Sequence, residues 1–351
     1  MSSVFLSFVV PCYNVRAFLP KCIESLEKQS IPGQGVEFVL VNDGSEDDTL
    51  GIIREFAARD SRVIVIDQPN QGVSAARNSG LAAAQGEYVF FLDGDDFLTD
   101  DASQAMYDFC QDKHPDIALF SNYRIREGST ERKPWYISTR HLPPGYYETG
   151  EYLRVTSFLP ISVKLYRRSF LNAHQITFDR DLVAGEVFTF FIHALSLSES
   201  VGVCPSYVMC YLRRRSKSAM STIDVERDLT ILDTLHTITR YADAGRVRLK
   251  DNRAFLAASF RVVTAFALIK YAVKTRYRKE HGVLLARVKQ DQDYDALLKY
   301  LTGRGRSWSG TTLQAFCIRF LPPRIAYGII RGLKRIHNFV LRVRNCVNRW
   351  R

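Results

Sequence analysis

Short apolar runs alternate with helical stretches through the first hundred residues, and this alternation constrains the fold more than any other feature of the chain. Continuous apolar strands separated by amphipathic helices are typical of a parallel sheet with helices on both faces. We therefore predict an α/β fold with a Rossmann-like, mostly parallel sheet. The expected strands lie at residues 5–14, 36–45, 62–70 and 88–96, and the expected helices at 15–30, 46–60 and 72–86.

Ligands of such sheets bind past the carboxyl ends of the strands. Four places with polar or aromatic side chains fall at these ends: Tyr13, Asp43, residues 68–70 and Asp93. We expect them to meet along one edge of the sheet, which makes that edge the first place to look for a site.

The fourth apolar run leads directly into "DGDD", which places Asp93, Asp95 and Asp96 within four positions. Two carboxylates 4 Å apart repel by about 1 kcal/mol in water and by about 4 kcal/mol at an effective dielectric constant of 20. A divalent cation removes this repulsion, and carboxylate oxygens suit Mg²⁺ or Mn²⁺. The turn therefore indicates a metal-bridged nucleotide diphosphate, unless Asp95 or Asp96 simply begins the helix expected at 100–110.

Four blocks follow one another along the chain: "SFVVPCYN", "VLVNDGSEDDT", "NQGVSAARNSGLAAAQGEYVFFLDGDDFL" and "KLYRRSFL". Together they resemble the family 2 glycosyltransferases, which have the GT-A fold. The resemblance is strong from residue 5 to about 100 and looser from 160 to about 220. It implies a metal-dependent inverting enzyme that moves a sugar from a nucleotide-diphosphate donor, a UDP-sugar above all, to a saccharide or polyisoprenoid-linked acceptor in surface polysaccharide biosynthesis.

The resemblance also implies roles for single residues at the donor site. Pro11 and Tyr13, in the motif that ends with Asn14, would lie against the nucleotide base, and Asp43 would accept a hydrogen bond from uracil N3–H. A turn at Asp43 and a core position for Tyr13 are the alternatives. The other positions that would surround the donor are Asn70, Gly72 and Arg77.

The same resemblance assigns the acidic turn. Asp95 would be the direct ligand of Mn²⁺ or Mg²⁺, Asp93 would lie near the ribose and the metal, and Asp96 would support them. Arg77 would approach the sugar or phosphate, unless it is a surface cation.

The family usually draws its catalytic base from the Asp of "G-E-D-x-x-F". Gly185, Glu186 and Phe190 fit this spacing, but Val187 stands where the Asp is expected. Three readings stay open. Glu186 is the base; or an upstream carboxylate, Asp181 or Asp179, reaches in; or the chain binds donor and transfers slowly or not at all. Glu186 could also serve only to stabilise the start of a helix at 187–197.

Further on, Arg213 and Arg214 begin a basic loop with Arg215 and Lys217 that in the family meets the donor diphosphate, although such a run can also be solvated surface. Lys164 matches a family position near the acceptor.

We divide the 351 residues into a GT-A domain at 1–225, with a nucleotide half at 1–100 and a less regular acceptor half at 101–225, a helical domain at 226–321, and a basic helix at 322–351. The apolar stretch 254–273 contains Arg261 and Lys270, which favours a buried helix over a membrane span. The start shows no signal peptide, and seven scattered cysteines suggest buried thiols in a cytosolic protein.

The net charge of +11 resides in the end of the chain. After Asp295 there are 12 of the 48 basic residues and none of the 37 acidic ones, so the rest is nearly neutral. On a helix from 324 onward, apolar residues form one stripe. Five arginines lie within about 40° on the opposite side: Arg324, Arg331, Arg335, Arg342 and Arg349.

Such a helix could lie on the inner face of the cell membrane as a peripheral anchor, or pack against the body with its arginines toward water. No nucleic-acid-binding module is recognised. Besides the transferase, two further functions stay open: a catalytically weak nucleotide-sugar-binding protein, and a basic membrane-binding module.

Overall fold

The computed structural model describes residues 4–135, 143–155, 163–182, 185–214, 230–244 and 290–292, and the account below concerns these residues. The chain forms two compact units. The first comprises Met1–Leu182, Glu186–Ser216 and Tyr241–Ala254, and the second Val183–Gly185, Lys217–Arg240 and Phe255–Arg351.

The first unit is built on a mixed sheet in the order β3-β2-β1-β4-β9-β6-β10-β5, with β7 beside β6 and β8 beside β10. The first four strands are mutually parallel, and β10 runs parallel to β6. The short strands β5, β7, β8 and β9 are antiparallel to their partners. The strands are β1 (Val4–Cys12), β2 (Gly35–Asp43), β3 (Val63–Gln68), β4 (Tyr88–Phe91), β5 (Phe97–Leu98), β6 (Ile117–Arg126), β7 (Lys133–Trp135), β8 (Gly145–Glu148), β9 (Lys164–Arg167) and β10 (Ser200–Arg213).

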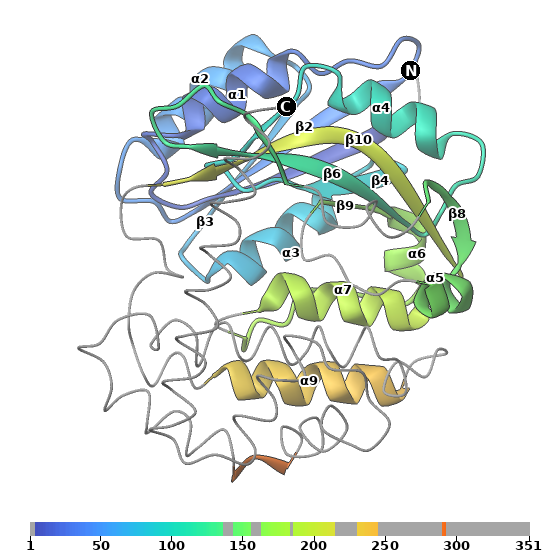
Figure 1. The fold of residues 1–351 in the computed structure, drawn as a ribbon. Coiled ribbons are helices and arrows are strands. Elements are labelled where there is room, and N and C mark those ends of the chain that lie inside the picture. Colours follow the sequence, from blue (N-terminus) through green and yellow to red (C-terminus); the bar gives the residue numbers. More distant parts are fainter. Residues whose placement is uncertain are drawn as a thin grey trace, which may run out of the picture. The chain divides into compact units, whose positions relative to one another are not determined.

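Helices cover both faces of this sheet (Figure 1). One face carries α1 (Leu19–Glu27), α2 (Thr49–Arg59) and α4 (Ala102–Cys110), and the other carries α3 (Val73–Ala83) and α7 (Glu186–Leu197). Two shorter helices, α5 (Thr149–Val155) and α6 (Arg168–Ala173), follow β8 and β9. The predicted α/β fold with a mostly parallel sheet is confirmed.

Alternation along the central strands explains how both faces become apolar. On the α1 side, the fully buried ring of Phe8 lies 6.0 Å from that of Phe38 and 5.7 Å from that of Phe90, measured between centroids. On the other side, α3 approaches the sheet so closely that a Cβ atom at Gly80 would lie 2.3 Å from Val9 Cγ1. Glycine at position 80 thus sets the distance between α3 and the strands that carry the site.

Two expectations about the middle of the chain need correction. The described residues between 101 and 214 are more regular than expected, because β6 and β10 are long and parallel and short antiparallel strands flank them. The strand β7 contains Pro134, which an edge strand tolerates. The helix α4 begins at Ala102, after β5, with Asp101 at its N-cap, so neither Asp95 nor Asp96 begins it.

Five of the cysteines lie in the described part of the chain, and all are buried free thiols: Cys12, Cys22, Cys110, Cys204 and Cys210. Most of α9 (Ile231–Ala244) belongs to the second unit, where His236 Nε2 lies 2.7 Å from Asp291 Oδ2. No helix among the described residues is both long and apolar enough to cross a bilayer. The stretch 254–273 and the basic helix predicted at 322–351 lie outside the described residues.

Lys164, the first residue of β9, is a buried cation in the first unit. Its side chain is 6% exposed, and its ammonium lies 4.6 Å from the centroid of the Phe191 ring. Among the described residues it forms no ion pair with a carboxylate. Burial disfavours the charged form and lowers the pKa of Lys164 to about 7.

This lysine gives the folding stability a predictable pH dependence. The pKa of an unfolded lysine is about 10.4, so between pH 7 and pH 10 the unfolded chain binds more protons than the folded chain, and stability rises with pH across that interval. We expect Lys164→Met to raise the melting temperature at pH 6.5 and to lose most of this advantage by pH 9.5. The exposed Lys113→Met is the matched control, and a pH-independent difference between the two variants would contradict the prediction.

Candidate active site

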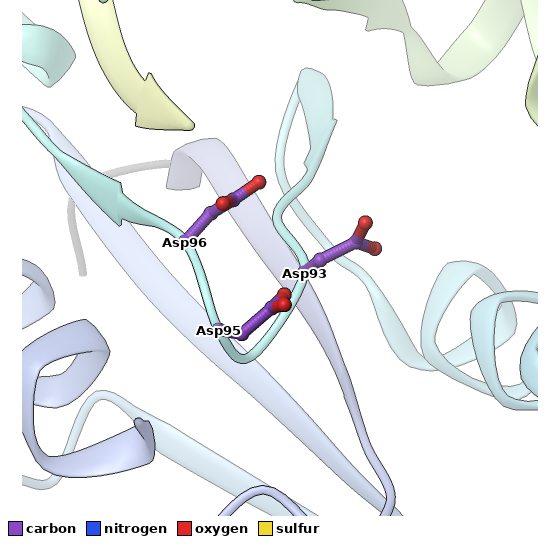
Figure 2. Close-up of side chains that lie close together, drawn as sticks. All are labelled: Asp93, Asp95 and Asp96. Atoms are coloured by element: carbon purple, nitrogen blue, oxygen red, sulfur yellow. The ribbon is translucent and has the colours of Figure 1, made fainter. Parts of the chain in front are cut away.

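The turn between β4 and β5 gathers three carboxylates at the carboxyl edge of the parallel strands. One oxygen from each of Asp93, Asp95 and Asp96 lies within 4.8 Å of the other two, and Figure 2 shows the three side chains projecting from the same short loop. Gly94 brings this acidic turn against β1, because a Cβ atom there would lie 3.3 Å from Cys12 Sγ. Three carboxylate oxygens at this spacing suit a hard divalent cation such as Mg²⁺ or Mn²⁺.

The three carboxylates differ in their surroundings. The Asp93 side chain is 49% exposed and that of Asp95 is 22% exposed, whereas Asp96 is buried. Burial raises the pKa of Asp95, the charge of Asp93 raises it further, and Arg214 opposes both. Burial also raises the pKa of Asp96 well above its usual range, with the charges of Asp95 and Asp93 adding to the effect. The cluster therefore holds its negative charge against a free-energy cost that a bound cation would relieve.

Asp96 connects the acidic turn to the far half of the sheet. Its Oδ1 accepts a hydrogen bond of 2.8 Å from the backbone N–H of Leu212, near the end of β10. The Asp96 side chain thus holds the turn in place, while Asp93 and Asp95 remain more open to a ligand.

The two arginines of the predicted basic loop differ in their contacts. The guanidinium of Arg214 forms an ion pair with Asp95 and lies 4.5 Å from the centroid of the Phe18 ring. Arg213 is exposed and forms no ion pair with a carboxylate in the described part of the chain. Arg215 and Lys217 lie outside the described residues. Of Arg213 and Arg214, only Arg214 forms an ion pair with the acidic turn.

Arg77 is the central cation of the site. It projects from α3, is 4% exposed, and donates to Asp93 Oδ1 at 2.7 Å and to Glu186 Oε1 at 3.0 Å. Burial by itself would lower the pKa of Arg77, but Asp93 and Glu186 outweigh burial and raise it. Arg77 is thus a buried bridge between two carboxylates and not a surface cation.

The bridge brings Glu186 beside the acidic turn. Glu186 is the first residue of α7, and its side chain is 18% exposed. The upstream candidates behave differently: Asp179 Oδ1 accepts a hydrogen bond from the backbone N–H of Asp181, and among the described residues neither Asp179 nor Asp181 bonds to the acidic turn. Of the carboxylates considered as the base, Glu186 is therefore the one that the structure joins to Asp93.

Asp43, at the end of β2, organises the neighbouring loop. Its Oδ1 accepts hydrogen bonds from Gln68 Nε2 and the N–H of Gln71, and its Oδ2 accepts one from the N–H of Gly72. Asn70 Oδ1 also accepts from the N–H of Gly72, which has a φ of +88°. This network fixes the loop that leads into α3, the helix that carries Arg77.

The motif after β1 is arranged around a second loop. Asn14 has a φ of +50°, and its Oδ1 accepts a hydrogen bond of 2.9 Å from the N–H of Glu46. Pro11 is buried in register with Val41 of β2, while Tyr13 is 46% exposed. Tyr13 therefore offers an accessible ring at this edge, whereas Pro11 and Asn14 shape the backbone around it. The roles assigned to all of these residues stay predictions.

Some contacts of the site had no signal in the sequence. Arg77 and Glu186 are 109 positions apart, and Asp96 and Leu212 are 116 positions apart. A backbone N–H such as that of Leu212 carries no residue-type signature at all. Only the assembled sheet shows these contacts.

Comparisons with known proteins show which family and which fold this chain resembles. Residues 7–174 match the profile of glycosyl transferase family 2. The chain is 30% identical over 221 residues to the uncharacterized glycosyltransferase EpsJ of Bacillus subtilis, covering 62% of this chain and 63% of EpsJ. It is 28% identical over 223 residues to the poly(ribitol-phosphate) beta-glucosyltransferase of Bacillus spizizenii, covering 62% of this chain and 33% of that protein. The matched regions thus span less than two thirds of these relatives.

The fold is also found among solved structures. The crystal structure of S. aureus TarS 1-349 in complex with UDP-GlcNAc superposes with a TM-score of 0.64 at 18% identity, over 95% of this chain and 92% of that chain. This likeness shows that the mostly parallel sheet with helices on both faces has the GT-A arrangement.

The Arg77 bridge predicts a stability effect. Arg77→Met would leave Asp93 and Glu186 as neighbouring carboxylates without their shared cation. We expect this change to lower the free energy of unfolding by about 3 kcal/mol. This value is the low end for a broken buried ion pair, because the Asp93 side chain is half exposed. Arg77→Lys should lose less, since one charge remains. Urea unfolding measures both changes.

Arg54→Met is the matched control for this experiment. Arg54 pairs with Asp67 on the surface, 3.4 Å away, so its loss should cost less than about 1 kcal/mol. Equal effects of Arg77→Met and Arg54→Met would show that the buried bridge does not stabilise the fold.

Proposed function

The chain belongs to glycosyl transferase family 2, and from this premise we propose that it is a metal-dependent inverting glycosyltransferase. It moves a sugar from a nucleotide-diphosphate donor, a UDP-sugar, to a saccharide or lipid-linked saccharide acceptor in surface polysaccharide biosynthesis. The observation that carries the proposal is the Arg77 bridge, which sets a candidate base beside a candidate metal-binding turn at the edge where such sheets bind ligands.

The donor end of the proposal is supported by the acidic turn. Asp95 and Asp93 would hold Mn²⁺ or Mg²⁺, because their oxygens form a compact set of hard donors. When bound, the cation supplies positive charge that offsets the charge developing on the leaving diphosphate. Arg214, already paired with Asp95, adds a protein cation on the same side. The binding of UDP-GlcNAc by TarS, which shares the fold, supports a UDP-sugar as the donor class.

Glu186 is the proposed base. It accepts the proton of the acceptor hydroxyl while that oxygen attacks C1 of the donor sugar. The bond from C1 to the diphosphate oxygen breaks, its electron pair leaves with the diphosphate, and the configuration at C1 inverts. Arg77 positions the carboxylate of Glu186 next to Asp93, so the base and the donor-binding turn keep a fixed separation.

One alternative function has a specific observation behind it. Val187 supplies no carboxylate at the position where the family usually has one, so a nucleotide-sugar-binding protein with weak or no transfer is the competing proposal. This alternative has the same donor site as the proposed transferase. The two functions differ only in whether the bound sugar is transferred to an acceptor.

The two functions separate in a paired experiment. A thermal-shift panel of nucleotide sugars with Mn²⁺ first identifies the donor. Glu186→Gln should then lower sugar transfer at least about 100-fold, the size expected for loss of a general base, while Mn²⁺-dependent UDP binding persists. Asp95→Asn should abolish that binding, and Asp181→Asn is the matched control.

Several results would overturn these assignments. Unchanged turnover of Glu186→Gln would remove Glu186 as the base, and a loss confined to Asp181→Asn would move that role upstream. Intact Mn²⁺-dependent UDP binding in Asp95→Asn would show that the metal site is misplaced. Donor binding without transfer in the unaltered protein, with every acceptor offered, would favour the binding protein.

We also propose that the basic helix at 322–351 attaches the protein peripherally to the inner face of the membrane, where a lipid-linked acceptor resides. The support is its charge pattern alone, with each arginine near anionic lipid contributing about 1 kcal/mol. The triple substitution Arg331→Ala, Arg335→Ala and Arg342→Ala should therefore weaken binding to anionic vesicles about 100-fold.

Sedimentation of the full chain with anionic and neutral vesicles measures this attachment. The control removes three cations elsewhere, by Arg54→Ala, Arg59→Ala and Lys113→Ala. Similar sedimentation of the two triple variants would contradict the anchor, and would leave the arginines of 322–351 with a role in packing or solubility.

A further inference from the structure

A cluster of aromatic and arginine side chains lies on the β6, β7 and β10 strands, and of its members only Arg213 has been considered so far. The guanidinium of Arg124 lies 3.3 Å from the centroid of the Trp135 ring, and the Trp135 ring meets that of Tyr211 edge to face at 5.5 Å. Arg124 is in register with Tyr211, and Arg213 follows two residues later on the same face. We call Arg124, Trp135, Tyr211 and Arg213 the aromatic–arginine platform.

The platform has positive charge without internal compensation. Neither Arg124 nor Arg213 forms an ion pair with a carboxylate among the described residues, whereas Arg77 and Arg214 do. The buried Nε of Arg124 also has no hydrogen-bond partner there. Burial and the charge of Arg213 both lower the pKa of Arg124, so the two cations repel each other. An anion between them would relieve this repulsion and accept charge-assisted hydrogen bonds from the two guanidinium groups.

The platform also offers apolar surface. Tyr211 is 39% exposed, Arg213 is exposed, and Trp135 is half-buried. An aromatic ring held by its neighbours gives large contact area at little cost in conformational entropy, and the C–H face of a sugar ring is a suitable partner for it. Positive charge and exposed aromatic rings therefore occur together on one stretch of sheet.

Its position ties the platform to the acidic turn. Residues 211–214 run past the turn, because Leu212 donates its N–H to Asp96 and Arg214 pairs with Asp95. The charges of Asp96, Asp95 and Asp93 add to burial in raising the pKa of Tyr211, which places that ring within electrostatic reach of all three. A molecule on the platform would thus lie beside a donor bound at the turn.

We propose that the aromatic–arginine platform is the acceptor subsite and that it selects a saccharide bearing an anionic group, either a phosphodiester or a carboxylate. Arg124 and Arg213 bind the anion, and Tyr211 and Trp135 pack against the adjoining sugar ring. This inference rests on the proposed transferase function and adds the class of acceptor to it.

The test compares three oligosaccharide series of equal length as binding partners of the full chain loaded with UDP and Mn²⁺. One series is neutral, one contains hexuronic acids, and one is linked by phosphodiesters. Isothermal titration should show that at least one anionic series binds about tenfold tighter than the neutral one, with the difference shrinking as salt is raised. The preferred anionic series identifies which group the two arginines recognise.

Variants then assign the effect to the platform. Arg124→Gln should weaken binding of the preferred anionic series about tenfold. The affinities for UDP and for the neutral oligosaccharides should stay unchanged. Arg124→Lys, which keeps the charge, should lose less. Arg132→Gln is the matched control. The Arg132 guanidinium lies 6.0 Å from the centroid of the Tyr123 ring, and Tyr123 points to the opposite face of the sheet from its neighbour Arg124.

The outcomes against this inference differ from those against the proposed function. Equal affinity for neutral and anionic series, or equal effects of Arg124→Gln and Arg132→Gln, overturns the acceptor assignment even if UDP binds normally. Failure of the unaltered protein to bind UDP with Mn²⁺ contradicts the donor site instead. The oligosaccharide comparison, repeated without nucleotide, then still decides whether the platform binds anions.

Discussion

Concentrated negative charge at the end of β4 is the constraint on which the rest of the site depends. Three carboxylates within 4.8 Å of one another repel strongly in a partly buried turn, and the fold supplies arginines to offset this. Arg77 reaches Asp93 from α3, and Arg214 reaches Asp95 from the end of β10. These two ion pairs join segments from both halves of the sheet, so the acidic turn is also a point of assembly for the first unit.

The same constraint explains why the candidate base lies where it does. A buried arginine needs carboxylate partners, and Arg77 takes Glu186 as its second one. Helix α7 therefore begins beside the acidic turn at the carboxyl edge of the parallel strands. With Val187 next in the chain, the carboxylate that approaches the acidic turn is one carbon longer than the family's usual aspartate and starts one residue earlier.

The pattern of apolar and polar residues predicted the first four strands and the turns that end them. The ends of β1, β2, β3 and β4 fall where apolar runs give way to polar turns, and Asp43 and Asp93 were placed correctly at those ends. The chain after residue 100 was harder to predict, because four of its strands, β5, β7, β8 and β9, are short and antiparallel to their partners. Pro134 and Lys133 in β7 resemble a loop in sequence, and only their pairing with β6 makes them a strand.

Individual site contacts were harder still. Nothing near Arg77 indicates that it will share its guanidinium between Asp93 and Glu186, because the partners meet only when the whole sheet has formed. Asp96 illustrates the same limit. From the sequence alone it could be the N-cap of a helix, whereas in the fold it is buried and accepts a hydrogen bond from the N–H of Leu212. Residue types and spacing predict which groups are available, and tertiary contacts decide which of them meet.

The hydrogen bonds of Asp43 bear on which base the proposed donor site accepts. An ionised carboxylate has about four lone-pair positions, and Gln68, Gln71 and Gly72 fill three of them. The remaining position can receive one more N–H, such as that at N3 of uracil. Cytosine carries an unprotonated nitrogen at the same place, and two acceptors would then face each other with no proton between them. If the proposed donor site is correct, the loop that leads into α3 would therefore favour uracil over cytosine.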